Sequence, residues 1–136
     1  MPLVIGLTGG LGAGKTSFVR ALLRGLGYQD RVPSPTYTLL EQYDLDCLTV
    51  IHMDLYRLAS AAEFEHLGVR DWLAEPRVWL LVEWPERAPQ LLQRADLMIE
   101  LEIVSENARR LVFSACTERA RPLLAAISEP DSNKPS

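Results

Sequence analysis

Apolar residues near the start of the chain change their spacing across a run of glycines. Residues 3–8 form a short, nearly continuous apolar run, which is typical of a buried strand. Residues 15–26 instead repeat apolar side chains three and four positions apart, which predicts a helix that Gly25 and Gly27 bring to an end. The pattern therefore predicts a strand, a glycine-rich loop and a helix, in that order.

Three further runs predict strands in the middle of the chain. Residues 36–44 and 47–53 are strand-like and are joined by a short polar turn, which suggests a hairpin. Residues 78–82 are almost entirely apolar, as expected for a central strand that is covered on both faces. Between them, residues 59–73 predict a helix that is broken at Gly68.

The C-terminal part predicts a second hairpin and a last helix. Residues 96–104 alternate apolar and polar side chains, and residues 110–115 are expected to pair with them antiparallel. Residues 118–127 predict a helix, and residues 128–136 a disordered tail. With 136 residues, 48% of them hydrophobic, the chain can bury one sizeable core, so we expect residues 1–127 to form a single domain.

Charge and composition argue against several classes of protein. A net charge of −4 leaves no basic surface for a nucleic-acid backbone, so any RNA is expected to be held by a partner. No apolar run approaches the roughly 20 residues of a membrane span, and the first residues lack a signal-peptide pattern, so we expect a cytoplasmic protein that does not contact membranes. Cys47 and Cys116 lack metal-ligand spacing and are expected to be buried free thiols.

Residues 9–16 (GGLGAGKT) match the P-loop pattern G-x-x-x-x-G-K-[ST] between the predicted strand and helix. Backbone N–H groups of such a loop surround a phosphate, Lys15 reaches the β- and γ-phosphate oxygens, and the Thr16 hydroxyl ligates Mg²⁺. Only Lys15 and Lys134 are lysines among the 14 basic residues, which favours a role for Lys15 that needs a compact charge. The nucleotide-binding residues expected from this segment are Gly9, Leu11, Gly12, Ala13, Gly14, Lys15, Thr16 and Ser17.

Two of the apolar runs end in an acidic residue, Asp54 and Glu83. The motif predicts an α/β protein, the three-layer sandwich of P-loop NTPases with a mixed, largely parallel central sheet, and ligands collect at the carboxyl ends of such strands. Because Glu83 follows the more fully buried run, we assign it with Thr16 to Mg²⁺. Asp54 is expected either to make a second, water-mediated Mg²⁺ contact or to orient the attacking water. Lys15, Asp54 and Glu83 thus form the expected catalytic group.

Other polar and aromatic residues leave more than one interpretation open. Thr36 and Thr38 follow a proline-rich stretch and fit a switch segment that contacts the γ-phosphate and Mg²⁺, or simply an edge strand. His52 and His66 have no metal-ligand spacing and are interpreted as a strand residue and a helix-surface residue. Trp84 is expected to pack in the core or at the rim of the site.

Four segments together resemble the TsaE (YjeE) family of P-loop ATPases of bacterial tRNA threonylcarbamoyladenosine synthesis. They are GGLGAGKT (9–16), SPTYTL (34–39), HMDLYRL (52–58) and LVEWPE (81–86). The resemblance implies an ATPase that uses ATP and Mg²⁺ and joins TsaB and TsaD in modifying the adenosine next to the anticodon of tRNAs that read ANN codons. It also implies that the positions of Thr16 and Glu83 hold Mg²⁺ and that the position of Asp54 matters for turnover.

Two features depart from the family pattern. The family usually has an acidic residue where this chain has Gly10, and it usually carries an additional N-terminal strand and helix that supply part of the adenine contact. Here the P-loop follows almost directly on the first residue. The resemblance therefore leaves the contribution of that region to base binding open.

Two alternative functions remain at this level. Residues 5–10 (IGLTGG) also resemble dephospho-coenzyme A kinase and related small-molecule kinases, which transfer the γ-phosphate to a hydroxyl; only Arg109 and Arg110 hint at the arginine-bearing lid such an enzyme needs. A binding module that orders residues 32–39 when ATP is bound is the second alternative. The guanine-reading NKxD motif does not occur in the sequence, which favours ATP as the nucleotide.

Overall fold

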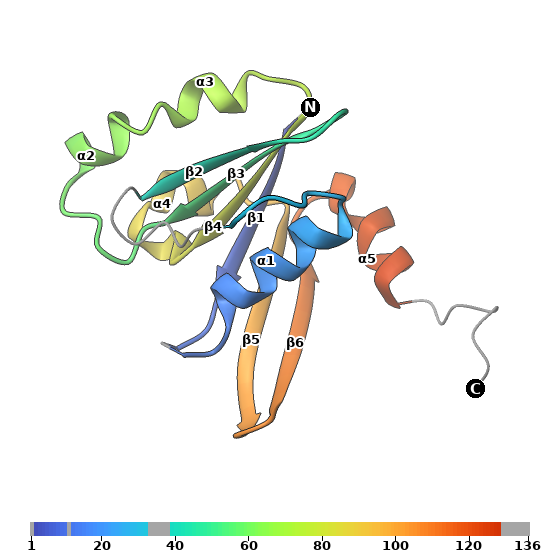
Figure 1. The fold of residues 1–136 in the computed structure, drawn as a ribbon. Helices are drawn as coiled ribbons and strands as arrows, with labels where there is room; N and C mark the ends of the chain where they lie inside the picture. The colour runs from blue at the N-terminus through green and yellow to red at the C-terminus, as the bar shows by residue number, and fades with distance from the viewer. Residues whose placement is uncertain (1, 11, 33–38, 129–136) are drawn as a thin grey trace.

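The computed structural model describes residues 2–10, 12–32 and 39–128, and it is built around one six-stranded sheet (Figure 1). The strands lie in the order β2-β3-β4-β1-β5-β6. Their bounds are β1 Leu3–Thr8, β2 Leu40–Asp44, β3 Thr49–Asp54, β4 Val78–Glu83, β5 Leu97–Ser105 and β6 Ala108–Ala115. The helices are α1 Lys15–Gly25, α2 Ala61–Glu65, α3 Val69–Leu73, α4 Pro89–Leu92 and α5 Arg121–Ser128, with short 3₁₀ turns at Pro85–Arg87 and Glu118–Ala120.

The four central strands of the sheet are parallel and the two edge strands are antiparallel. β1 pairs in parallel with β4 and with β5, and β3 pairs in parallel with β4. β2 and β6 each pair antiparallel with the strand beside them in the chain, β3 and β5. The carboxyl ends of β1, β3 and β4 therefore lie at the same edge of the sheet, as the mixed, largely parallel sheet predicted from the sequence requires.

Helices cover both faces of the sheet, which gives three layers. On one face, Val19 and Leu23 of α1 pack against odd-numbered residues of β1 such as Ile5. On the other face, helices α2 to α4 contribute Phe64, Val69 and Leu91 to a second core. Because β1 and β4 bury both of their faces, they are apolar at almost every position.

Glycines set both ends of α1. Gly14 precedes the helix with a φ of 98°, a left-handed conformation that favours glycine. After the helix, Gly27 has a φ of 101°, its N–H donates to the Arg24 carbonyl, and the Tyr28 N–H donates to the Leu23 carbonyl. This is a Schellman motif, and it ends the helix at Gly25, one residue before the end predicted from the sequence.

The connections confirm one sequence-based expectation and differ from it in two other places. The helix predicted over residues 59–73 is broken at Gly68, as expected, because this glycine adopts a φ of 71° between α2 and α3. The turn Pro85–Arg87 and helix α4 were not predicted, because two prolines and a four-residue helix leave no apolar period to detect. The last helix extends through Ser128, and the predicted disordered tail beyond it lies outside the described residues.

The prediction of buried thiols is wrong, because Cys47 and Cys116 are both exposed. The apolar run that begins at Cys47 does not become a strand until Thr49, so Cys47 lies in the turn between β2 and β3. Cys116 follows the edge strand β6. Among the residues that the structure describes, no helix is both long and apolar enough to span a membrane.

Candidate functional site

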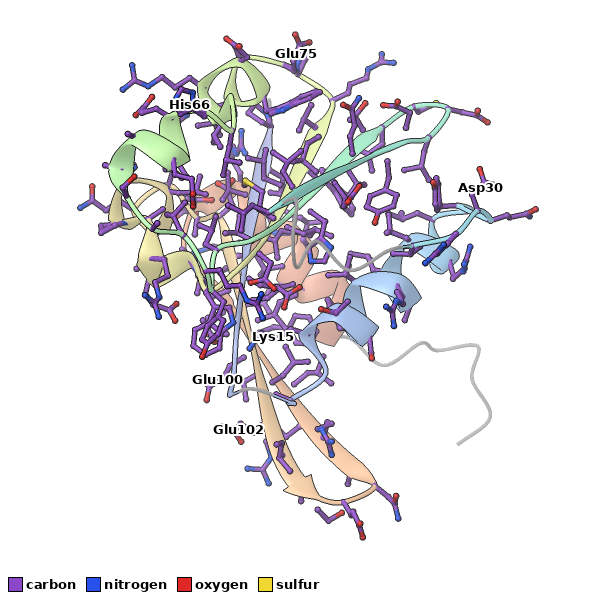
Figure 2. All side chains as sticks on the ribbon, turned by 60° about the vertical axis from the view of Figure 1, so that its left-hand side comes forward. Lys15, Asp30, His66, Glu75, Glu100 and Glu102 are labelled. Carbon is purple, nitrogen blue, oxygen red and sulfur yellow. The ribbon has the colours of Figure 1, made fainter. Side chains whose placement is uncertain are left out.

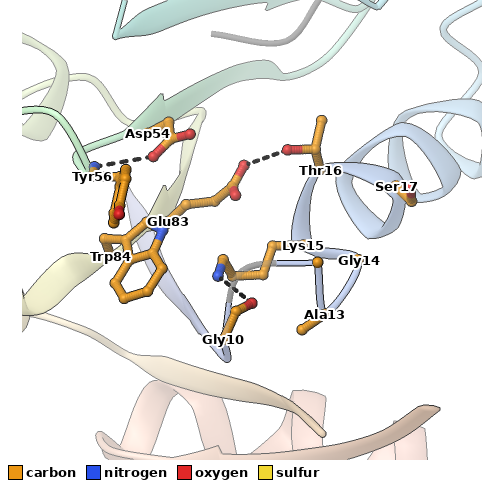
Figure 3. Close-up of a pocket in the computed structure, with 11 residues that line it drawn as sticks. Gly10, Ala13, Gly14, Lys15, Thr16, Ser17, Asp54, Tyr56, Glu83 and Trp84 are labelled. Atoms are coloured by element: carbon orange, nitrogen blue, oxygen red, sulfur yellow. Dashed lines mark hydrogen bonds between the residues drawn. The ribbon is translucent and has the colours of Figure 1, made fainter. Parts of the chain in front are cut away.

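The glycine-rich loop, the start of α1 and the ends of β3 and β4 enclose a cavity of about 350 Å³ (Figure 3). Figure 2 shows Lys15 near the middle of the molecule, far from Asp30 beyond the other end of α1. The cavity is lined by Gly10, Gly12, Ala13, Gly14, Lys15, Thr16, Ser17, Asp54, Tyr56, Glu83 and Trp84. The structure thus brings six residues of the predicted loop and both predicted acids to one place.

Lys15 is buried at the centre of this group, with 6% of its surface exposed. Its Nζ donates to the carbonyl oxygens of Gly9 at 2.6 Å and Gly10 at 3.2 Å, and it lies 4.2 Å from the centre of the Trp84 ring. Burial lowers the pKa of Lys15, although the nearby carboxylates, Glu83 foremost, act in the opposite direction. The ammonium is therefore poorly hydrated and placed to bind an anion that enters the cavity.

The two predicted acids lie side by side. Asp54 and Glu83 are register partners on the parallel strands β3 and β4. Glu83 is 3% exposed, and its Oε2 accepts a hydrogen bond of 3.1 Å from the Thr16 hydroxyl. Asp54 accepts a 3.0 Å bond from the Tyr56 N–H, and burial, reinforced by Glu83, raises the pKa of Asp54. The hydroxyl and one carboxylate assigned to Mg²⁺ are thus in contact.

Oxygen donors at this point fit the chemistry of Mg²⁺ in P-loop proteins. Mg²⁺ keeps several waters and takes one or two protein oxygens together with phosphate oxygens, so it does not need a cage of protein ligands. The described residues contain no group of three or more His, Cys, Asp or Glu side chains that could hold a metal ion. The Thr16 hydroxyl and the Glu83 carboxylate, with Asp54 beside them, match the sparse donor set that this kind of site uses.

Sequence reasoning missed His52 and also Tyr56, which lines the cavity. His52 was interpreted as an ordinary strand residue, but its side chain is fully buried and its Nε2 lies 2.6 Å from Glu83 Oε2. The two-residue period of a strand places the side chain of His52 on the same face of β3 as that of Asp54, so its position near the site could be predicted. The contact with Glu83 could not, because it depends on the register of β3 against β4, which places His52 level with Leu81.

The long β5–β6 hairpin reaches back to the glycine-rich loop from the far end of the chain. Arg109 on β6 donates from Nε to the Ala13 carbonyl at 3.2 Å, and from Nη1 to the Ser105 carbonyl at 2.8 Å. Gly9 packs so closely against β5 that a Cβ at this position would lie 2.6 Å from the Leu101 carbonyl oxygen. The hairpin therefore supports the loop that surrounds the cavity.

Two aromatic side chains form the rim of the cavity beside the acids. The rings of Tyr56 and Trp84 lie 4.9 Å apart, and the Arg87 guanidinium lies 5.7 Å from the centre of the Tyr56 ring. Trp84 has a φ of 59°, which is uncommon for a side-chain-bearing residue and turns the chain sharply after Glu83. Trp84 lines the cavity and also packs against the second core, which agrees with the expectation of core or rim packing, and the same ring contacts Lys15.

Some predicted site residues are not placed at the cavity. Leu11, Thr36 and Thr38 lie outside the described residues. Gly9 does not line the cavity, although its carbonyl accepts from Lys15. His66 is an exposed residue at the end of α2, as predicted. The switch-segment interpretation therefore stays a prediction.

A strand, a glycine-rich loop and a helix carrying Lys15 and Thr16, set beside two acids at the ends of parallel strands, define the P-loop NTPase fold. YdiB of Bacillus subtilis has a similar crystal structure, with a TM-score of 0.71 and 29% sequence identity over 93% of this chain and 77% of that chain. The predicted fold class is thereby confirmed.

Sequence comparisons identify the family within this fold. The family model described as "Threonylcarbamoyl adenosine biosynthesis protein TsaE" matches residues 1–111. The tRNA threonylcarbamoyladenosine biosynthesis protein TsaE of Haemophilus influenzae is 37% identical over 93% of this chain and 78% of its own length. The protein of the same name from Bacillus subtilis is 34% identical over 94% of this chain and 79% of its own length. The chain belongs to the TsaE family, which confirms the resemblance inferred from its four motifs.

Proposed function

We propose that this chain is a Mg²⁺-dependent ATPase required for threonylcarbamoylation of the adenosine next to the anticodon in tRNAs that read ANN codons. It acts with a TsaB–TsaD complex, and tRNA contacts it only through these partners. Membership of the TsaE family supports the place in tRNA modification. The observation that carries the ATPase is the contact between Thr16 and Glu83 at the edge of a cavity lined by the P-loop.

Each part of the cavity has a task in this reaction. Backbone N–H groups of the loop and the start of α1 would hold the phosphates, and Lys15 would neutralise their β- and γ-oxygens. Thr16 and Glu83 would hold Mg²⁺, which supplies further neutralisation of charge on the same oxygens. Asp54, with a raised pKa, would orient the attacking water or contact the ion through water. Tyr56 and Trp84 would limit access of bulk water.

The test follows the fate of the γ-phosphate. With radiolabelled ATP and Mg²⁺, the wild-type chain is expected to release free phosphate, and Glu83→Gln to bind nucleotide but release phosphate at least about 100-fold more slowly. Lys15→Ala is expected to lose nucleotide binding, because it removes the buried cation. When dephospho-coenzyme A is added as the phosphate acceptor, label that appears on coenzyme A instead of free phosphate would contradict the ATPase and favour the kinase alternative.

A further inference from the structure

His52 occupies a position where an apolar residue would be expected. On β3 it stands between Val50 and Asp54 on the face towards α1, and no part of its surface is exposed. Its neighbours along the strand, Ile51 and Met53, are fully buried apolar residues of the opposite core. A histidine in this setting needs hydrogen-bond partners on both ring nitrogens, or it destabilises the fold.

Only one ring nitrogen of His52 has such a partner among the described residues. Nε2 lies 2.6 Å from Glu83 Oε2, whereas Nδ1 has no hydrogen-bond partner there. Because an ionised carboxylate can only accept, we assign the hydrogen to Nε2, which then donates to Glu83. The contact is as short as charge-assisted hydrogen bonds are, and it is fully enclosed.

The same Glu83 oxygen accepts from both His52 and Thr16. The Thr16 hydroxyl is also assigned to Mg²⁺; it would ligate the ion through an oxygen lone pair, and its O–H can still donate to Glu83. His52 is the other side-chain donor to Glu83 among the described contacts, and burial in β3 holds it in place.

We propose that His52 is a positioning residue, which fixes the Glu83 carboxylate in the orientation that receives Mg²⁺ with the nucleotide phosphates. This inference rests on the proposed function and deepens it. His52 touches neither substrate nor ion; it acts through Glu83. Groups that orient a metal ligand commonly change metal affinity by about 10–100-fold when they are removed.

Three substitutions, of which glutamine and asparagine form a matched pair, separate this role from simple packing. In glutamine, the amide nitrogen is three bonds from Cβ, as Nε2 is in histidine, so His52→Gln keeps a donor within reach of Glu83. In asparagine the amide nitrogen is one bond closer, at the place of Nδ1, and falls short of the carboxylate. His52→Leu removes the donor and fills the space with an apolar side chain.

The measurement is calorimetric titration of ADP into the full chain, in excess EDTA and across a series of Mg²⁺ concentrations, with the melting temperature of each variant as a check on folding. We expect all variants to bind ADP in EDTA within about 2-fold of wild type. His52→Leu and His52→Asn should need about 10–100-fold more Mg²⁺ to reach the half-maximal increase in ADP affinity, and His52→Gln should recover most of that loss.

Three outcomes overturn the inference in distinguishable ways. An unchanged Mg²⁺ midpoint in His52→Leu and His52→Asn shows that His52 does not position Glu83. An equal loss of ADP affinity with and without Mg²⁺ shows a packing role only. If wild type fails to bind ADP in the presence of Mg²⁺, the proposed function itself fails, and this inference fails with it.

Discussion

Burial shifts the pKa of two of the ionisable side chains that line the cavity, Lys15 and Asp54. Burial lowers the pKa of Lys15 and raises the pKa of Asp54, which in each case disfavours the charged form. Bound phosphates would compensate the lysine, and an ion or a proton would compensate the aspartate. At the scale of single residues, burial therefore favours the binding of ligands that compensate these two charges.

Asp54→Asn tests whether the buried charge of Asp54 lowers the stability of the fold. Because burial raises the folded-state pKa of Asp54 above its usual 3.8, the folded protein holds that proton more tightly than the unfolded chain does. The ionised carboxylate therefore lowers the free energy of unfolding at pH values above the raised pKa. This loss of stability becomes smaller as the pH falls and is absent below pH 3.8. Asparagine removes the charge and can still accept from the Tyr56 N–H.

We expect Asp54→Asn to melt a few degrees above wild type at pH 7.5, with the difference shrinking as pH is lowered towards 4, while phosphate release falls. Thermal unfolding followed by circular dichroism at several pH values measures the difference. A variant that is less stable than wild type at pH 7.5 would show that the Asp54 charge is compensated within the fold.

Two neighbouring glycines test how the hairpin shapes the loop, at the scale of the element. Gly9 has a φ of 143°, and its Cβ would meet the backbone of Leu101; Gly10 has open space around it. We expect Gly9→Ala to destabilise the fold by about 1–3 kcal/mol and to weaken ADP binding, whereas Gly10→Ala should change stability by less than about 0.5 kcal/mol. Urea unfolding of both variants makes the comparison, and equal losses would contradict the close packing of Gly9 on β5.

Arg109 tests the second link between the hairpin and the loop. A trans peptide points its carbonyl and its N–H in opposite directions, so the bond from Arg109 to the Ala13 carbonyl also fixes the direction of the Gly14 N–H. Losing one such hydrogen bond, worth about 1 kcal/mol, should weaken ADP affinity by roughly 5-fold in Arg109→Ala.

Arg110→Ala is the matched control for this substitution. Arg110 forms an exposed ion pair with Glu102 at 3.4 Å, and pairs of this kind contribute little. ADP titration should therefore leave Arg110→Ala close to wild type. If both variants bind ADP equally well, Arg109 does not shape the loop.

The parts of the site that the sequence predicted are those encoded by local pattern. The loop with Lys15 and Thr16 needs only a motif between a strand and a helix, and Glu83 ends a buried apolar run. The contact of His52 with Glu83 spans 31 residues and that of Arg109 with Ala13 spans 96. Such contacts depend on strand register and on the reach of a hairpin, which no local spacing encodes.

At the scale of the whole molecule, the sheet gathers the site at one edge. Parallel pairing of β3, β4 and β1 brings Asp54 and Glu83 level with the loop at the carboxyl ends of these strands. Helix α1, which follows the loop, covers one face of the same strands. The antiparallel β5–β6 hairpin extends the sheet past that edge (Figure 1) and exposes Ile103 and Val104, each with 56% of its surface accessible. The topology of the sheet thus brings Lys15, Asp54 and Glu83 together in one small cavity.

The proposed ATPase is tested most directly by the rate of phosphate release from ATP in the presence of Mg²⁺, measured for the chain alone and with TsaB and TsaD. We expect slow release by the chain alone, a clear increase when both partners are added, and no increase with Glu83→Gln. Release at the same rate with and without the partners, or undiminished release by Glu83→Gln, would contradict the proposed function.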